Sequence, residues 1–148
     1  MQEVRWGIIG CGDVAEIKSG PAFQKAENSD LLAVMRRDAD LAEDFAKRHN
    51  VPLWYTDAQD LLKNPEINAV YIATPPSSHL DYALQALSAG KDVYIEKPMV
   101  CSTVEVNQLY EIASKSKNKL VVAHYRRFLP LYIKVKELLE NSVIGQVR

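Results

Sequence analysis

The sequence predicts an α/β fold in three layers, with a doubly wound parallel sheet between two layers of helices. Three observations support this fold class. Short apolar runs alternate with segments of helical periodicity along the chain. Several of these runs are apolar at consecutive positions, as strands covered by helices on both faces require. A glycine-rich turn directly follows the first run, and the alternation of strands and helices favours parallel pairing.

The apolar runs predict six strands, at residues 4–9, 31–35, 53–55, 69–74, 92–96 and 120–124. Between them, side chains at helical spacing share one face and predict crossover helices. These faces comprise Leu41, Ala42, Phe45, Ala46 and His49; Leu80, Ala83, Leu84 and Leu87; and Val106, Leu109, Tyr110 and Ala113. Gly90 is placed as a C-terminal cap, and Ser102 with Glu105 forms the pattern of a capping box.

The composition is that of one ordinary globular domain, with 148 residues, 47% hydrophobic and 25% charged. A formal charge of −1 with interspersed acids and bases gives no reason to expect nucleic acid or an anionic membrane as partner. A small-molecule ligand fits better. No run has the length of a membrane span or the pattern of a signal peptide, so we expect a cytoplasmic protein.

The cysteines and histidines predict no metal site, because neither set has ligand spacing. Cys11 and Cys101 are interpreted as small packing residues, with a redox-sensitive Cys11 as the alternative. His49 ends a helical face, where a positive charge is favourable.

The opening stretch WGIIGCGDVA contains the pattern G-x-G-x-x-A at Gly10, Gly12 and Ala15, between a strand and a helix. In this context the pattern indicates a dinucleotide-binding turn. The first glycine permits the turn, the second lets the backbone approach a pyrophosphate, and the small third residue allows helix and strand to pack closely. The amides of Asp13, Val14 and Ala15 then face the phosphates. The alternative is a tight turn with no ligand.

The end of the second strand bears on the choice of dinucleotide. An acid there would bind the ribose hydroxyls of NAD, but the residues are Arg36 and Arg37. A guanidinium forms charge-assisted contacts with phosphate, so NADP is favoured over NAD. Alternatively, both arginines are solvated surface charges and Asp38 caps the next helix.

Four ordered motifs resemble the nucleotide-binding domain of the Gfo/Idh/MocA oxidoreductases. They are GIIGCGDVA, ATPPSSH at 73–79, AGKDVYIEKP at 89–98 and AHYRRFLP at 123–130. The resemblance implies a Rossmann fold in a two-domain, homo-oligomeric enzyme that transfers hydride between a nicotinamide and a carbinol or carbonyl carbon. The implied substrate is a sugar, cyclitol or related polyol.

The resemblance also implies roles for particular residues. Thr74, Pro75 and His79 would line the cofactor, and Glu96 and Lys97 would lie near the nicotinamide ribose and the substrate. Lys97 is the lysine to which the family assigns a catalytic role. The segment from His124 to Phe128 matches the nicotinamide end of the site.

Physical chemistry supports a role for Lys97 independently, because it follows the fifth strand at its carboxyl end, where open α/β sheets bind ligands. A protonated lysine there can hydrogen-bond the reacting oxygen and stabilise alkoxide character. The alternative is a surface lysine paired with Glu96. For His79 the alternative is a structural histidine, and for His124 it is core packing.

The resemblance covers only the first domain of the family. Members pair the lysine with a histidine in a D-x-x-x-H pattern from the second domain, and this chain has no aspartate after Asp92. We therefore expect a truncated chain, with a dinucleotide-binding domain at 1–125 and a connecting helix and the start of a substrate domain at 126–148. A short disordered tail is the alternative. Alone, this chain should bind cofactor with little or no turnover.

Two other functions stay open for the same fold. One is a non-catalytic sensor that uses the cofactor to read redox state. The other is a glycoside hydrolase that retains NAD and regenerates it in each cycle.

Overall fold

The computed structural model describes residues 3–146, and these form one six-stranded, all-parallel sheet in the order β3-β2-β1-β4-β5-β6. The strands are β1 (Val4–Ile9), β2 (Ser29–Met35), β3 (Leu53–Tyr55), β4 (Ala69–Ile72), β5 (Asp92–Ile95) and β6 (Leu120–Val122). Strand order reverses between β1 and β4, which places a crevice at their carboxyl ends. The predicted fold class is confirmed.

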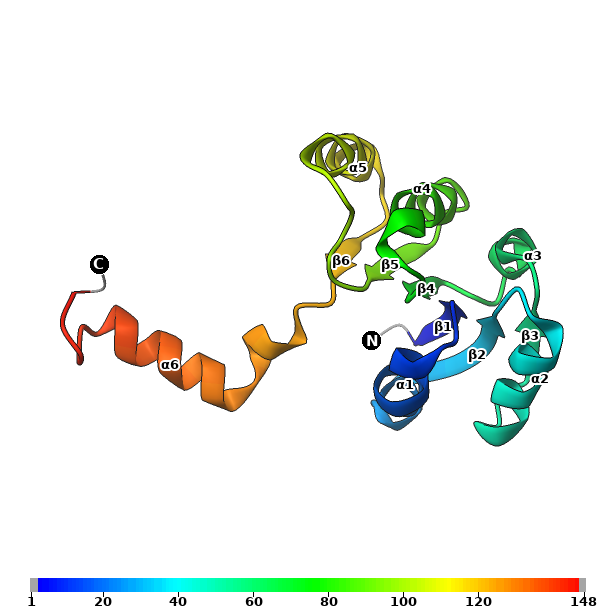
Figure 1. Cartoon of the computed structure of the whole chain (residues 1–148), viewed down its shortest axis with the longest axis horizontal. Helices are drawn as coiled ribbons and strands as arrows, with labels where there is room; N and C mark the ends of the chain where they lie inside the picture. Colours follow the sequence, from blue (N-terminus) through cyan, green and yellow to red (C-terminus); the bar gives the residue numbers. More distant parts are fainter. Residues whose placement is uncertain (1–2, 147–148) are drawn as a thin grey trace.

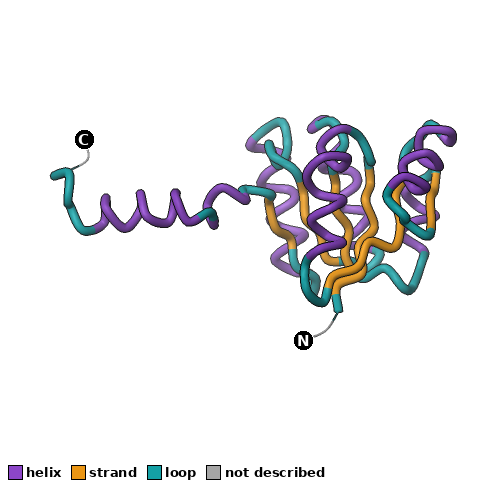
Figure 2. The backbone as a smooth tube through the Cα atoms, turned by 90° about the horizontal axis from the view of Figure 1, so that it is seen from below, coloured by secondary structure: helices purple, strands orange, loops and turns teal. Residues whose placement is uncertain are grey.

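The helices cover both faces of the sheet (Figures 1 and 2). They are α1 (Gly20–Lys25), α2 (Ala39–Arg48), α3 (Ala58–Lys63), α4 (His79–Ser88), α5 (Thr103–Lys115) and α6 (Pro130–Glu140). Helices α1 and α2 lie on one face, and α3, α4 and α5 lie on the other (Figure 1).

Two apolar cores follow from this arrangement, one on each face of the sheet. Ile9, Met35 and Ile72 pack with α3, α4 and α5, whereas neighbouring strand residues such as Ile8 and Val34 pack with Phe23 and Phe45 of α1 and α2. Successive strand residues point to opposite faces. The consecutive apolar positions in the sequence therefore correspond to a sheet buried on both sides.

The helix caps expected from the sequence are present. Ser102 accepts a hydrogen bond from the Glu105 N–H (3.2 Å), and the Glu105 carboxylate accepts one from the Cys101 N–H (2.7 Å). Asp38 caps α2 through the Leu41 N–H (3.1 Å). Gly90 follows α4 with a φ of +72°. These polar contacts explain why the helices begin and end where they do.

Strands β4, β5 and β6 end one or two residues earlier than predicted, at Ile72, Ile95 and Val122. The residues that follow each strand leave the ladder and turn into the crevice. Thr74, Glu96 and His124 therefore lie in loops at the carboxyl edge of the sheet. This is the edge at which a ligand of an open α/β sheet binds.

The helix after β1 begins with a π-helical turn, η1 (Ala15–Ser19), which the sequence analysis did not predict. The Gly20 N–H donates to the Ala15 carbonyl, five residues back, and Gly20 and Pro21 are the first residues of α1. Proline has no N–H and its ring clashes with the carbonyl four residues earlier in an α-helix. The wider turn accommodates Pro21 without ending the helix.

Helix α6 extends away from the sheet (Figures 1 and 2). It contacts mainly the short 3₁₀ turn η3 (Tyr125–Phe128), and none of its side chains is buried. Its apolar residues, including Leu131, Ile133 and Val135, are exposed.

Gly10 permits the close approach of the β1 and β4 ends. Its φ is +93°, and a Cβ at this position would lie 2.7 Å from Thr74 Cγ2 and 2.9 Å from the Thr74 backbone nitrogen. A contact below 3.0 Å with backbone cannot be relieved by turning a side chain. Only glycine combines this conformation with this separation.

We therefore predict that Gly10→Ala destabilises the fold by at least about 1–3 kcal/mol, because both the positive φ and the contact with Thr74 are unfavourable. Urea unfolding followed by circular dichroism measures the change. Gly12→Ala is the matched control, since a Cβ at Gly12 would meet no heavy atom within 4 Å. Equal stability of the two variants would contradict the steric argument.

Candidate functional site

The sequence-predicted residues meet at the carboxyl edge of the sheet, where they line two pockets. The first, here the β1–β4 pocket, has a volume of about 240 Å³ and lies at the point where strand order reverses. The predicted residues that line it are Gly10, Gly12, Arg36, Arg37, Thr74 and Pro75. The second, here the β5–β6 pocket, has a volume of about 560 Å³ and is lined by the predicted residues Val14, Glu96, Lys97 and His124.

The glycine loop has the features of a phosphate-binding turn. The space beside Gly12 is open, so the protein itself does not need a glycine there. The first intrahelical bond runs from the Glu16 N–H to the Gly12 carbonyl (2.9 Å). The N–H groups of Asp13, Val14 and Ala15 precede that bond, where a helix leaves its donors available to a ligand. Ala15 is fully buried, which fits the small residue required there.

The two arginines after β2 differ in their surroundings. Arg36 is half-buried, and its Nη1 donates to the Cys11 carbonyl (3.3 Å), which holds it across the glycine loop. Arg37 is exposed at the rim of the same pocket. Asp38 caps α2 at the same time, so the cap does not remove Arg36 from the pocket.

A charge cluster anchors the helix that follows the glycine loop. The Glu16 carboxylate accepts hydrogen bonds from Arg48 Nη1 and Nη2 and lies 2.6 Å from His49 Nε2. The Arg48 hydrogen bond is the main reason why the pKa of Glu16 falls to about 2. The cluster joins the start of the first helix to the end of α2. His49 therefore contacts a carboxylate in addition to ending its helix.

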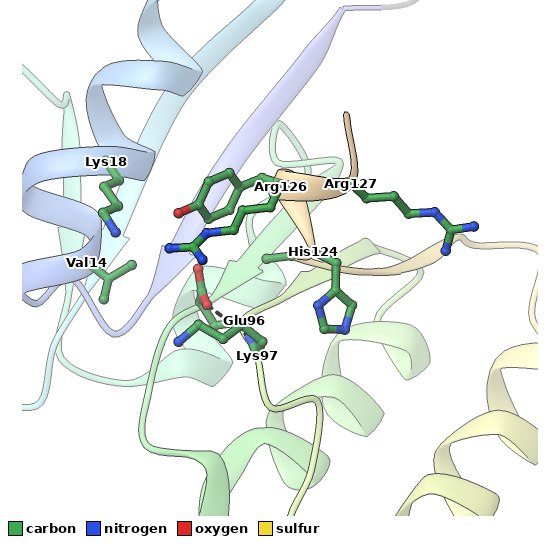
Figure 3. A pocket seen from close by; sticks show the side chains of 9 residues that line it. Val14, Lys18, Glu96, Lys97, His124, Arg126 and Arg127 are labelled. Atoms are coloured by element: carbon green, nitrogen blue, oxygen red, sulfur yellow. Dashed lines mark hydrogen bonds between the residues drawn. The ribbon is translucent and has the colours of Figure 1, made fainter. Parts of the chain in front are cut away.

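Figure 3 shows the β5–β6 pocket from close by. Lys18 and Arg126 reach in from opposite sides toward Glu96, and Lys97 lies beneath them. The Arg127 side chain points away from this group. Lys97 is exposed, and its peptide bond to Pro98 is cis.

Glu96 is held by hydrogen bonds to both of its oxygens. The Tyr71 hydroxyl donates to Oε1 (2.8 Å), and the Lys97 N–H donates to Oε2 (2.9 Å). The Ser19 hydroxyl in turn donates to the Tyr71 oxygen (2.8 Å). Burial raises the pKa of Tyr71, whose side chain is fully enclosed. This series of hydrogen bonds connects the helix after the glycine loop to the Glu96-Lys97 loop.

His79 lies behind the pocket wall, and its side chain is only 1% exposed. Its Nδ1 is 3.0 Å from the Pro98 carbonyl and 3.2 Å from that of Met99, and its Nε2 is 2.8 Å from the Thr74 carbonyl. The ring thus fixes the Thr74 loop and the Lys97-Pro98 loop relative to each other. This geometry matches the structural alternative considered for His79, and a cofactor contact made directly by His79 would need the ring to be exposed.

The other titratable candidates have simple environments. Burial raises the pKa of the Cys11 thiol to about 11, which favours the unreactive thiol form. His124 is exposed at the pocket, so the packing alternative does not describe it.

Within residues 3–146, no cluster of histidine, cysteine or acidic side chains has the arrangement of a metal site. Among these same residues, no helix is both long enough and apolar enough to cross a membrane.

Sequence reasoning missed three side chains of the site: Lys18, Tyr71 and Tyr82. Arg126 falls in the segment from His124 to Phe128 that it placed at the nicotinamide end. Lys18 carries a detectable signal, because it lies four residues after Val14 and so shares its helical face. Tyr82 lies in the first turn of α4, after the Thr74 loop, and lines the β1–β4 pocket. Tyr71 gives no local signal, since its position in an apolar strand is that of an ordinary core residue.

Comparison with known proteins agrees with this geometry. Residues 4–124 match the family described as "Oxidoreductase family, NAD-binding Rossmann fold". The chain belongs to this Gfo/Idh/MocA family and contains its NAD-binding Rossmann domain.

Among curated relatives, Oxidoreductase P35 of Formosa agariphila is 62% identical over 144 residues, which cover 97% of this chain and 45% of the relative. Trans-1,2-dihydrobenzene-1,2-diol dehydrogenase of Xenopus tropicalis is 30% identical over 97% of this chain and 44% of its own length. The chain therefore spans less than half the length of these relatives.

Two solved structures are also similar. The 3-ketoreductase KijD10 of Actinomadura kijaniata, in complex with NADP and TDP-benzene, matches with a TM-score of 0.92 and 28% identity over 99% of this chain and 45% of its own. The scyllo-inositol dehydrogenase of Lactobacillus casei, with bound NAD(H) and scyllo-inositol, has a TM-score of 0.90 and 25% identity, over 98% and 43% of the two chains.

We predict that Tyr71→Phe lowers the free energy of unfolding by about 1–3 kcal/mol, because it leaves the Ser19 hydroxyl and one Glu96 oxygen without their buried partner. Chemical denaturation of both proteins measures the difference. Tyr110→Phe on α5 is the control, since Tyr110 is 74% exposed. A Tyr71 variant as stable as this control would show that the hydrogen-bond chain contributes nothing.

Proposed function

We propose that this chain is the cofactor-binding half of an oxidoreductase acting on a CH–OH group, with a sugar, cyclitol or related polyol as substrate. The observation that carries the proposal is the position of Lys97. It lines a pocket continuous with the glycine loop through Val14, at the edge of the sheet where ligands bind. The bound scyllo-inositol of the Lactobacillus casei enzyme supports a polyol as the substrate class.

In this proposal, the two pockets bind different parts of the dinucleotide. The loop amides would hold the diphosphate of the dinucleotide, and Arg36 in the β1–β4 pocket would hold the 2′-phosphate. The nicotinamide end would lie against Val14, Glu96 and His124 in the β5–β6 pocket. When bound, the nicotinamide supplies or accepts the hydride. Lys97 donates a hydrogen bond to the reacting oxygen and stabilises its alkoxide character. The fixed Glu96 carboxylate keeps the Lys97 backbone in place.

NADP is the preferred cofactor in this proposal. Arg36 is held over the glycine loop by the Cys11 carbonyl, and no acid occupies the position that would bind the ribose hydroxyls of NAD. A guanidinium placed there suits a 2′-phosphate. Of the two similar solved structures, the 3-ketoreductase holds NADP and the scyllo-inositol dehydrogenase holds NAD(H).

The remaining expectations concern the rest of the protein. Residues 126–148 are proposed to begin a second domain, which would close the β5–β6 pocket and exclude water from the hydride transfer. The expected histidine of the D-x-x-x-H pattern would come from that domain. A cytoplasmic location and a homo-oligomeric state also stay predictions.

We predict that Arg36→Ala weakens NADPH binding about 10- to 100-fold, as expected for a lost charged hydrogen bond, and leaves NADH binding nearly unchanged. Calorimetric titration of this chain with both nucleotides measures the two affinities. Arg5→Ala, near the start of β1 and so at the opposite edge of the sheet, is the control. Equal losses of affinity for NADPH and NADH would show that Arg36 does not bind the 2′-phosphate.

We also predict that Lys97→Met in the protein with its second domain lowers kcat about 100- to 1000-fold, because the donor to the developing alkoxide is lost. NADPH affinity should stay within about threefold. Steady-state kinetics with a panel of polyols and a separate binding titration give the two values. Lys117→Met, an exposed lysine after α5, is the matched control. Normal turnover in Lys97→Met would exclude the proposed role of Lys97. If the unmodified protein binds NADPH but turns over none of the compounds, the result would favour the sensor alternative.

A further inference from the structure

The β5–β6 pocket has an excess of positive charge. Lys18 enters it from η1, Lys97 from the loop after β5, and Arg126 from η3. In Figure 3 their side chains converge on Glu96, the one carboxylate among the residues that line the pocket. Lys18, the neighbouring pair Glu96 and Lys97, and Arg126 come from three segments far apart in the sequence, so their meeting is a property of the fold.

The three cations have no carboxylate partner of their own. Within residues 3–146, the ion pairs of the protein involve other side chains, and none includes Lys18, Lys97 or Arg126. Glu96 is already committed to Tyr71 and to the Lys97 N–H. Two of these charges affect the nearby Tyr125 hydroxyl. The Arg126 guanidinium, and then Lys18, lower the pKa of Tyr125.

The phosphates of the cofactor do not account for this excess. Arg36, Arg37 and the two loop glycines, which are proposed to bind or approach the phosphates, line the β1–β4 pocket, and the two pockets have no lining residue in common. The nicotinamide end of the dinucleotide would lie beside Val14 in the β5–β6 pocket, and an oxidised nicotinamide ring is itself positively charged. A neutral polyol would therefore leave three cationic side chains and the ring with Glu96 as the one carboxylate in the pocket lining, an excess of like charge that is unfavourable.

An oxyanion on the substrate would compensate these charges. A guanidinium binds a carboxylate or a phosphate through two parallel hydrogen bonds, and a lysine adds a mobile point charge. Arg126 and Lys18 lie above Glu96 in the view of Figure 3, whereas Lys97 lies beneath it. This arrangement leaves Lys97 for the reacting oxygen and the other two for a charged substituent.

We infer that the substrate is a sugar or polyol that carries an oxyanion, a carboxylate or a phosphate ester, bound by Lys18 and Arg126. This inference rests on the proposed function and narrows its substrate class. It makes Lys18 and Arg126 binding residues that select the acid over the neutral sugar.

The test compares matched compounds with the protein that carries its second domain, at low ionic strength. D-glucuronate and D-glucose 6-phosphate are compared with D-glucose, so that the two acids distinguish carboxylate from phosphate. We expect kcat/KM to be about 10- to 100-fold higher for one or both acids than for glucose. Binding of the same compounds, followed by nuclear magnetic resonance titration with and without NADP, should show the same preference.

Variants assign the preference to the named side chains. Arg126→Ala and Lys18→Ala should each reduce the acid-over-neutral ratio about tenfold or more, and Arg126→Lys should retain part of it. Arg5→Ala should leave the ratio unchanged, because Arg5 lies on β1 toward the amino end of the sheet. Circular dichroism confirms that each variant is folded.

The outcomes separate this inference from the proposed function. Equal behaviour of the acids and glucose in both measurements overturns the inference, including the case in which neither is bound or turned over. A preference that survives both alanine variants also overturns it. If the acids bind through Arg126 but nothing is oxidised or reduced, the anion site stands and the proposed dehydrogenase activity fails. If glucose is turned over as well as the acids, the activity stands and the anion site fails.

Discussion

The close approach of β1 and β4 at Gly10 is the constraint on which the site depends. Parallel strands that end side by side leave room for a ligand only if the chain leaves β1 without obstructing β4. Gly10 meets this requirement with a left-handed backbone and no side chain against Thr74. Gly12 then lies in open space, and the helix that follows begins with its amides facing that space. One glycine is therefore required by the protein, and the other is required only if a ligand is present.

The hydrogen bonds from Ser19 through Tyr71 to Glu96 join the helix after the glycine loop to the loop that carries Lys97. Tyr71 lies in the middle of the sheet, where an unpaired hydroxyl would be costly. Its hydroxyl therefore forms hydrogen bonds with both Ser19 and Glu96. His79 makes a comparable link on the other side of the site, between the Thr74 loop and the loop after Lys97. Lys97 and His124 at the pocket are exposed, whereas Tyr71 and His79, which fix the neighbouring loops, are buried. Rigid support beneath an open site is what precise placement of a reacting group requires.

The sequence was sufficient for the parts of the structure that depend on local rules. The six strands, the cap at Ser102 and the left-handed Gly90 follow from patterns a few residues long, and the glycine loop and Lys97 belong to motifs placed at strand ends. The π-helical turn could not be predicted, although Pro21 shows where a regular helix would fail. The Tyr71–Glu96 bond joins residues 25 positions apart, and the Ser19–Tyr71 bond spans 52. Such partners become visible only when the sheet brings them together.

The cluster around Glu16 has a consequence for the affinity of the glycine loop for anions. Glu16 lies in the first turn of the helix that faces the phosphate site, and a free carboxylate so close would repel a diphosphate. Arg48 and His49 hold that carboxylate and shield its charge. The low pKa of Glu16 means that this pairing stabilises the fold above the ordinary glutamate range and is lost as pH falls toward about 2. The end of α2 thus acts as an electrostatic screen, which allows the protein to keep an acid beside a site built for negative ligands.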